Sequence, residues 1–374
     1  MEGITEMTEN SKLLLFTGSY ASAAENGVQV YEFNGEDGGK LKLIDSAPGI
    51  TNPTFVNVDA ANRRLYAIGE KVNAEGIKEG EVVSFAIDPQ TGKLTELNRI
   101  PTMPALNSAQ TTTCHISRNV ESEYIVVCSY HGGLVGLLTL DENGQPLQLT
   151  DTAVHSGHGT VPGQEKPHPH SAIFSPDEKF LFVSDLGLDL IRSYRINREQ
   201  QTLEVHGETR VHPGAGPRHL VFHPDGKSAY VINELNSTVT SFLYDSEAGT
   251  LQTSVTVSTL PEDFPAENNG CAEIAFSKDG RYLYGSNRGH DSIVVYAVNP
   301  DTAELSLVEH VSTRGGHPRH FTVTPDGQYL IVANRDGNNL VVFSLDTASG
   351  KLSFTGNTAE LSKPVCVKPA VFPI

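Results

Sequence analysis

The sequence has no run of apolar residues long enough to cross a membrane. Its N-terminal stretch, MEGITEMTENSK, lacks the basic region and apolar core of a signal peptide. No segment shows helical periodicity over enough residues to form an amphipathic helix. The 4 cysteines are widely spaced, which is typical of reduced, mostly buried thiols. These absences predict a cytoplasmic protein that is largely without helices and is not bound to a membrane.

Basic residues are also few. The chain has 27 Lys and Arg against 45 Asp and Glu, which gives a net charge of -18. Nucleic acids and anionic membranes bind to a basic face of a protein, so we expect neither as a partner. A small anionic substrate remains possible, because it needs only a local basic pocket.

A strand–turn–strand unit occupies residues 214–234, GAGPRHLVFHPDGKSAYVINE. Two short runs of strand-forming residues flank the sequence Pro-Asp-Gly, which is typical of a tight turn. Arg218 precedes the first run and Glu234 follows the second. Because antiparallel strands place the start of one beside the end of the next, we expect these two charges to lie together.

This unit recurs along the chain at 175–185, 277–287 and 324–334, with weaker copies at 59–70 and 117–129. Each copy is followed by a third strand-like run and, after a turn, by a fourth. Four antiparallel strands make one blade of a β-propeller. The end of the second strand recurs seven times about every fifty residues, which predicts seven blades.

The repeats are out of phase at the two ends of the chain. Residues 13–16 form a second strand with no first strand before it, and residues 364–367 form a first strand with no second strand after it. We therefore predict an all-β, seven-bladed propeller over residues 12–374, in which both termini share one blade and close the ring. Residues 1–11 are predicted to be a disordered tail.

The innermost strand of a blade begins, and its second strand ends, near the same mouth of the central channel. This geometry gathers one set of side chains: Glu70, His170, Asp185, Arg218, Glu234, Arg288, Arg319 and Arg335. Arginine binds carboxylate or phosphate oxygens through two parallel hydrogen bonds, and a histidine or glutamate there can act as a general base.

Structural interpretations of the same residues stay open. Arg218 and Glu234 can form a salt bridge within one blade, and Arg319 and Arg335 can belong to the blade repeat. His219 and His320, which follow two of the arginines, are expected to pack or cap their blades.

The segment 151–169, rich in His and Gly, is long for a connection between blades and is predicted to be a flap over the site. A second insertion, 260–270, reaches the same rim. His155, His158, His168 and His170 are close enough in sequence to suggest a metal, but no cysteine or aspartate cluster accompanies them. We expect no metal and no cofactor, and no serine lies in a nucleophile-elbow setting.

Five stretches together resemble the seven-bladed propeller lactonases, which include bacterial 6-phosphogluconolactonases and fungal carboxy-cis,cis-muconate cyclases. The stretches are KPHPHSAIFSPDEKFLFVSDLGLD, GPRHLVFHPDGKSAYVINEL, YLYGSNRGHDSIVVY, HPRHFTVTPDGQYLIVANRDGNNLVVF and KPVCVKP. The resemblance implies a catalytic set of one His, two Arg and one Glu. His170, Arg218, Arg288 and Glu234 occupy the matching motifs.

The resulting hypothesis is a metal-independent hydrolase of a sugar lactone, 6-phosphoglucono-δ-lactone in particular, acting as a monomer or weak homo-oligomer. His168, Arg319, Arg335 and Asp185 are predicted to contact the anionic lactone. Two alternatives remain at this stage: a cyclase that lactonises a carboxylated muconate, and a non-catalytic propeller that binds other proteins through its rim.

Overall fold

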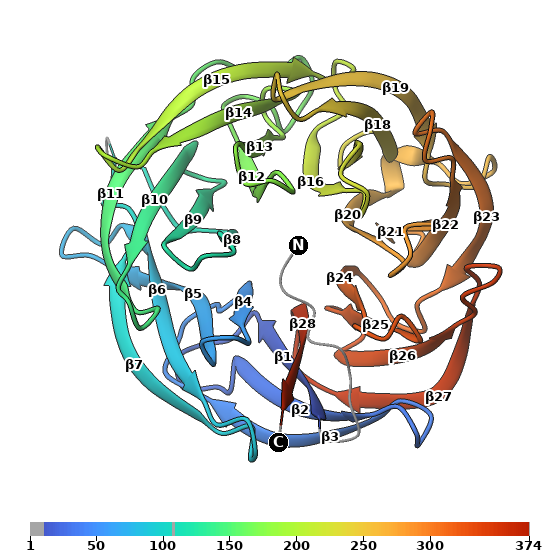
Figure 1. Ribbon diagram of the computed structural model, residues 1–374, viewed down its shortest axis with the longest axis horizontal. Helices are drawn as coiled ribbons and strands as arrows, with labels where there is room; N and C mark the ends of the chain where they lie inside the picture. Colours follow the sequence, from blue (N-terminus) through green and yellow to red (C-terminus); the bar gives the residue numbers. More distant parts are fainter. Residues whose placement is uncertain (1–10, 107–108, 374) are drawn as a thin grey trace.

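The computed structural model describes residues 11–106 and 109–373. They form seven four-stranded antiparallel sheets arranged as a ring around a central channel (Figure 1). The only helix among the described residues is the short 3-10 helix Ala266–Asn268. Consistent with this, none of the described segments is a helix capable of spanning a membrane. The predicted all-β propeller with seven blades is confirmed.

Each blade runs from the channel outward in four strands. The innermost strands are β4 (Val56–Asp59), β8 (His115–Arg118), β12 (Pro169–Phe174), β16 (Pro217–Phe222), β20 (Gly270–Phe276), β24 (Pro318–Val323) and β28 (Pro364–Pro373). The second strands are β5 (Arg64–Val72), β9 (Tyr124–Ser129), β13 (Leu181–Asp185), β17 (Ser228–Asn233), β21 (Tyr282–Arg288), β25 (Tyr329–Asn334) and β1 (Ser11–Ser19).

The outer two strands complete the blades. The third strands are β6 (Lys78–Ile87), β10 (Leu134–Leu140), β14 (Leu190–Asn197), β18 (Thr238–Asp245), β22 (Ser292–Val298), β26 (Asn339–Leu345) and β2 (Val28–Asn34). The fourth strands are β7 (Leu94–Pro101), β11 (Pro146–Val154), β15 (Thr202–Arg210), β19 (Thr250–Ser258), β23 (Leu305–Ser312), β27 (Leu352–Glu360) and β3 (Lys40–Ala47).

The ring closes through a blade built from both ends of the chain. Its strand order is β28-β1-β2-β3, and β1 pairs with β28 in the register Leu14↔Ala370 and Thr17↔Val367. Figure 1 shows the two terminal strands side by side in this blade. The predicted shared blade is therefore confirmed. The predicted tail, residues 1–11, lies outside the described residues except for Ser11, the first residue of β1.

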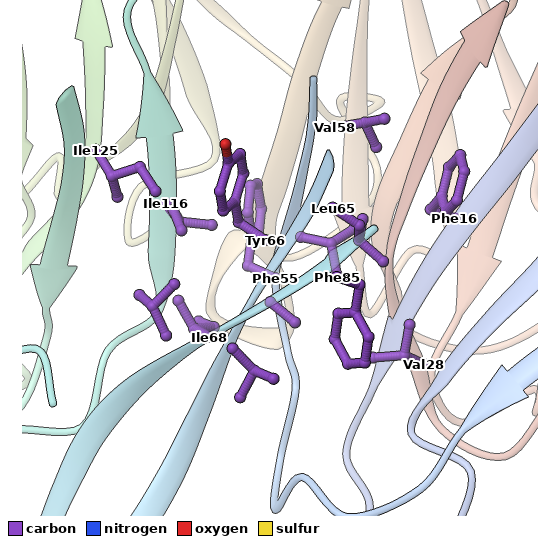
Figure 2. Close-up of a cluster of buried hydrophobic side chains, with 14 of the residues drawn as sticks. Phe16, Val28, Phe55, Val58, Leu65, Tyr66, Ile68, Phe85, Ile116 and Ile125 are labelled. Atoms are coloured by element: carbon purple, nitrogen blue, oxygen red, sulfur yellow. The ribbon is translucent and has the colours of Figure 1, made fainter. Parts of the chain in front are cut away.

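The hydrophobic core lies between neighbouring blades. Strands near the channel are covered on both faces, as in β13, where all five residues are buried. In outer strands such as β27, half-buried and exposed positions alternate over most of the length. Figure 2 shows one of the buried clusters, in which Phe16, Tyr66 and Ile116 come from three successive blades. Each blade therefore needs its neighbours to cover its apolar faces, which is why a closed ring forms one unit.

The predicted hairpin at 214–234 is present as β16 and β17, paired in the register Leu220↔Val231. Gly226 in its turn has a φ of 72°, a backbone conformation that glycine adopts without steric cost. The Asp225 carboxylate accepts a hydrogen bond from the backbone N–H of Lys227 at 2.9 Å, which stabilises the turn.

The segment predicted to be a long flap is shorter than expected. Residues 151–154 continue the outer strand β11, and β12 begins at Pro169, so the connection itself covers residues 155–168. The prediction was wrong for 151–154, because the strand continues in register beside β10, where Val135 pairs with Ala153.

Candidate active site

A recurring β-bulge places the candidate residues at the mouth of the channel. In β16, Pro217 pairs with Asn233 and His219 pairs with Ile232, so Arg218 is an extra residue without a partner in the register. The same shift makes His170 the extra residue of β12 and Arg319 that of β24. A bulge turns its extra residue out of the regular alternation of side chains. The same irregularity in three blades therefore places three of the predicted residues at the mouth of the channel.

Arg218 and Arg288 share one carboxylate. The Arg218 Nε lies 3.1 Å from Glu234 Oε2, and an Arg288 Nη2 atom lies 3.0 Å from the same oxygen. Arg218 and Glu234 belong to one blade, while Arg288 ends β21 in the next. The salt bridge expected between Arg218 and Glu234 within one blade is thus present. However, the second arginine leaves the group with an excess positive charge.

Backbone carbonyls of the β20 segment hold both guanidinium groups. Arg218 donates to Ala272 O at 2.5 Å, and Arg288 donates to Gly270 O and Cys271 O at 3.0 and 2.7 Å. The exposed fractions of the two side chains are 3% and 9%. Neutral carbonyls orient the arginines without cancelling their charge, so the cluster is arranged in advance for an anion.

Arg319 adds a third cation to this cluster. Its guanidinium lies 5.7 Å from the centroid of the Tyr20 ring, and no ion pair with a described carboxylate is found for it. Burial and the neighbouring Arg288 and Arg319 lower the pKa of Arg218 to about 9, so Arg218 remains charged at neutral pH.

Glu234 is ionised in this setting. Burial raises the pKa of its carboxyl, but Arg288, Arg218 and Arg319 outweigh that effect and hold the pKa below its usual range. The mouth therefore carries three guanidinium groups against one carboxylate. This is a local reversal of the chain's net charge of -18.

His170 lies beside the arginines as a neutral imidazole. Burial, together with Arg218 and His219, lowers its pKa well below that of an ordinary histidine. Its Nδ1 is buried and has no hydrogen-bond partner within the part of the chain that the structure describes. A neutral imidazole with an unused nitrogen is able to accept a proton.

His168 lines the same mouth together with Tyr130, which the sequence reasoning did not select. The two rings stack with centroids 4.0 Å apart, and His168 Nδ1 lies 2.7 Å from the carbonyl oxygen of Tyr130. The Tyr130 ring also contacts His170 edge-on at 5.6 Å. Tyr130 directly follows Ser129, the last residue of the second strand β9. This position in the sequence could have indicated that Tyr130 lies at the mouth of the channel.

Asp185 is one of the predicted substrate contacts. Its side chain is fully buried, and its oxygens lie 2.6 Å from His155 Nδ1 and 2.8 Å from the backbone N of His168. The carboxylate is thus occupied by partners in its own loop, and its contact with a substrate stays a prediction. Asp185 anchors the connection 155–168 at the residue before β12.

Arg335 and Glu70 also have other partners. Arg335 is paired with Asp336 through two contacts of 2.7 and 3.1 Å, and Glu70 pairs with Lys78 at 3.5 Å. The structure thus brings together His170, Arg218, Glu234, Arg288 and Arg319, with His168 beside them. Arg335 is paired with Asp336, and its contact with a substrate stays a prediction.

A layer of buried rings closes the channel beneath the arginines. Glu273 lies 3.1 Å from His219 Nδ1 and 2.9 Å from His320 Nε2. Phe55 packs against His115 and His320 with ring centroids 4.6 and 5.5 Å apart. The expected packing role of His219 and His320 fits these contacts. The sequence analysis did not select Glu273. It lies near the start of β20, in the blade between those of His219 and His320.

The histidines considered for a metal site are separated by their hydrogen bonds. His155 is buried between Asp185 and Tyr194, and the exposed His158 lies 2.9 Å from the carbonyl oxygen of Gly159. Across the two described ranges, no group of three or more His, Cys, Asp or Glu residues is placed to hold a metal ion.

A seven-bladed propeller with this cluster at its mouth defines a class of protein, and comparison with known proteins identifies the family. The family described as "Lactonase, 7-bladed beta-propeller" matches residues 14–369. The chain belongs to this family, and is therefore a lactonase-family enzyme.

Individual relatives agree with this assignment. The chain is 35% identical to 6-phosphogluconolactonase of Bacillus subtilis, over 96% of this chain and 98% of that one. A solved structure from Bacteroides fragilis is 33% identical with a TM-score of 0.87, covering 98% of this chain and all of that one. The periplasmic gluconolactonase PpgL of Pseudomonas aeruginosa is 30% identical with a TM-score of 0.88, covering 96% and 99%.

Proposed function

We propose that the protein hydrolyses a sugar lactone, and that 6-phospho-D-glucono-1,5-lactone is the substrate. The observation that carries this proposal is the cluster of three arginines around one carboxylate, with a neutral histidine beside it. Relatives named for a phosphorylated and for an unphosphorylated gluconolactone both lie at similar identity. The family alone therefore leaves the phosphate open, and Arg319 supports the phosphorylated substrate.

In this proposal Arg218 and Arg288 stabilise the negative charge that develops on the lactone carbonyl oxygen. Both are oriented by fixed backbone carbonyls, so little reorganisation is needed when the charge forms. Glu234 keeps the two guanidinium groups together while leaving them a shared net positive charge. The chemistry needs no metal, because the cations are supplied by side chains.

His170 is the proposed general base, whereas the sequence left the choice between His170 and Glu234 open. Its unused Nδ1 takes a proton from water as the water oxygen bonds to the lactone carbonyl carbon. When the ring C–O bond breaks, the same proton passes to the leaving ring oxygen, giving the open hydroxy acid. Glu234 is less suited, because both arginines contact its Oε2, whereas His170 Nδ1 has no partner among the described residues.

Substrate comparison in an Arg319→Met variant tests the phosphate assignment. We expect the variant to raise KM for 6-phosphogluconolactone at least about tenfold, the size of a lost charge-assisted contact. The KM for glucono-1,5-lactone should change little. Initial rates are measured after subtraction of spontaneous hydrolysis, with Arg335→Met as the matched control. Equal effects on both substrates would show that Arg319 does not bind the phosphate. If the wild-type protein acts on carboxymuconate alone, the cyclase would replace the lactonase as the proposed function.

The pH dependence of the rate tests the role of His170. Because its pKa is lowered, the imidazole stays neutral and active as a base when the pH falls through 6.5. We expect kcat/KM to remain level from pH 8 to about pH 6, whereas an unperturbed histidine would already have lost most of its base form. Glucono-1,5-lactone is the substrate for this profile, since it has no phosphate to titrate. A half-maximal rate at pH 6.5 would contradict the assignment.

A further inference from the structure

The channel has a second opening, which contains a cavity of about 650 Å³. We propose that this cavity binds a small organic anion with an apolar body, at a site separate from the proposed active site. The proposal does not depend on the proposed lactone or on its chemistry.

The direction of the innermost strands separates the two sites. In β16, Arg218 lies at the start, whereas Val221 and Phe222 line the cavity at the end. Three to four residues of extended chain span roughly 10–13 Å. The buried layer of Phe55, His115 and the other rings lies between them, and the cavity lining includes none of Arg218, Glu234 or Arg288.

The wall of the cavity is largely apolar and only partly covered. Its half-buried apolar side chains come from successive blades: Ile173, Phe174, Val221, Phe222, Phe276 and Val323. They occupy the last positions of the innermost strands, just before the turns. Such a volume and such a lining are typical of small-molecule sites, which combine an apolar wall with a few polar groups.

The charged groups of the cavity favour an anion. Lys278 and Lys368 line it, and neither has an ion pair with a described carboxylate. The Lys368 Nζ lies 4.9 Å from the centroid of the Phe55 ring, at the inner end of the cavity. Among the described residues, the only acid in the lining is Asp59, which lies 3.6 Å from Arg118 Nη1. The cavity therefore has a surplus of positive charge.

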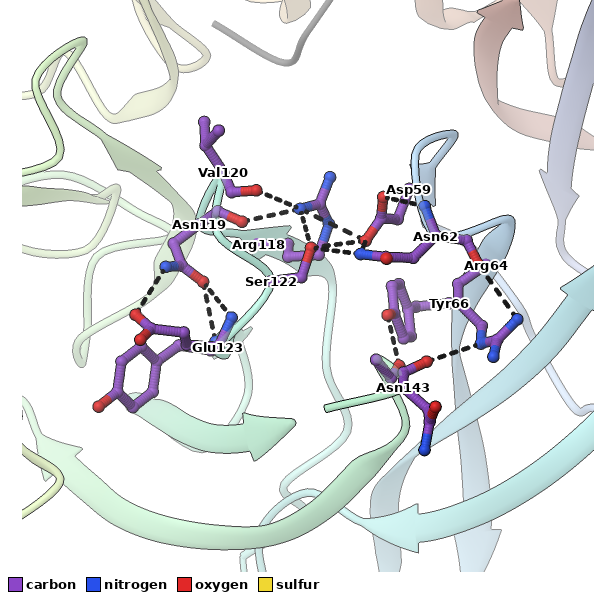
Figure 3. A network of polar contacts seen from close by, with 12 residues as sticks. Asp59, Asn62, Arg64, Tyr66, Arg118, Asn119, Val120, Ser122, Glu123 and Asn143 are labelled. Atoms are coloured by element: carbon purple, nitrogen blue, oxygen red, sulfur yellow. Dashed lines mark hydrogen bonds and ion pairs between the residues drawn. The ribbon is translucent and has the colours of Figure 1, made fainter. Parts of the chain in front are cut away.

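Arg118 adds a further positive charge to the wall. Its exposed fraction is 6%, and its hydrogen bonds to Asn119, Val120 and Ser122 all use Nη1. Figure 3 shows these contacts converging on one nitrogen of Arg118, from which the rest of the guanidinium extends away. The buried Nε has no hydrogen-bond partner among the described residues. The Nε is enclosed by the protein, so Arg118 contributes its positive charge to the wall of the cavity and does not offer this N–H to a ligand.

Calorimetric titration of the full-length protein with three matched probes tests this site. The probes are 2-naphthyl phosphate, 2-naphthoate and the neutral 2-naphthol. We expect one equivalent of at least one anion to bind at least tenfold more tightly than naphthol. Preference for the phosphate or for the carboxylate then identifies the class of natural ligand. Equal binding of naphthol, or no binding of either anion at millimolar concentration, would overturn the proposal.

Variants locate the bound probe. Lys368→Met should weaken anion binding at least tenfold, while Lys363→Met, at an exposed position outside the cavity, should leave it unchanged. Val120→Asp adds an anion at a rim position that is 50% exposed, and should weaken binding even if Lys368→Met folds poorly. Arg288→Met should retain full affinity. Loss of binding in Arg288→Met, with retention in Val120→Asp, would place the probe in the active site and refute a second site.

Discussion

An Arg218→Met variant is expected to lose about 10²–10³-fold in kcat/KM for 6-phosphogluconolactone, the range measured when one donor to a developing oxyanion is removed. The loss should appear mainly in kcat, because the proposed contact strengthens only as charge develops on the carbonyl oxygen. The carboxylate left behind keeps its 3.0 Å contact with Arg288, so the fold should persist.

The matched control is Arg198→Met, which removes an exposed arginine paired with Glu121 and Glu123 on the outside of the ring. This control should retain wild-type kcat. Circular dichroism and thermal melting of both variants confirm that the fold is intact. A wild-type kcat in Arg218→Met would exclude this guanidinium from the chemical step.

The protein should begin to lose stability as soon as the pH falls below about 6.5. Burial lowers the pKa of four channel histidines below the value of about 6.5 expected in the unfolded chain: His115, His170, His219 and His320. The unfolded state therefore binds more protons than the folded state as the pH falls below 6.5. Stability is fully present above that pH and declines towards the lowered folded pKa, which is about 4 for His219.

The expected size follows from linkage. Each such histidine contributes up to about 1.4 kcal/mol per pH unit, so the free energy of unfolding should fall by roughly 2–6 kcal/mol between pH 7 and pH 5. Urea unfolding at pH 7, 6 and 5 measures it. His320→Gln should reduce the slope, and His212→Gln, at an exposed position, should not. A free energy of unfolding that stays constant over this range would show that these histidines are not held neutral.

Much of the fold was predictable because it repeats. The turn Pro-Asp-Gly and the strands around it recur often enough to count blades, and the unmatched strands at 13–16 and 364–367 indicate ring closure. The site was predictable in part for the same reason: Arg218, Arg319 and His170 occupy one repeated position. What the repeat does not reveal is the bulge there, which determines where their side chains point.

The sequence was least informative about residues whose partners come from elsewhere in the chain. Asp185 pairs with Pro169 as Asn233 pairs with Pro217, so Asp185 corresponds to Asn233 and not to Glu234. It bonds His155, 30 residues away in a loop without a repeat. Glu273 bridges His219 and His320 across three blades, and only the packing of the innermost strands reveals that contact. Position within a blade was readable from the sequence, whereas the choice of partner depended on side-chain direction.

A crystal structure with 6-phosphogluconate, the product, would test most directly whether this mouth is where the lactone is opened. We predict the product carboxylate within hydrogen-bond distance of Arg218 and Arg288, near His170, with the phosphate on Arg319. Arginines still bound only to Glu234 and backbone, with the product held in the opposite cavity beside Lys368, would contradict it.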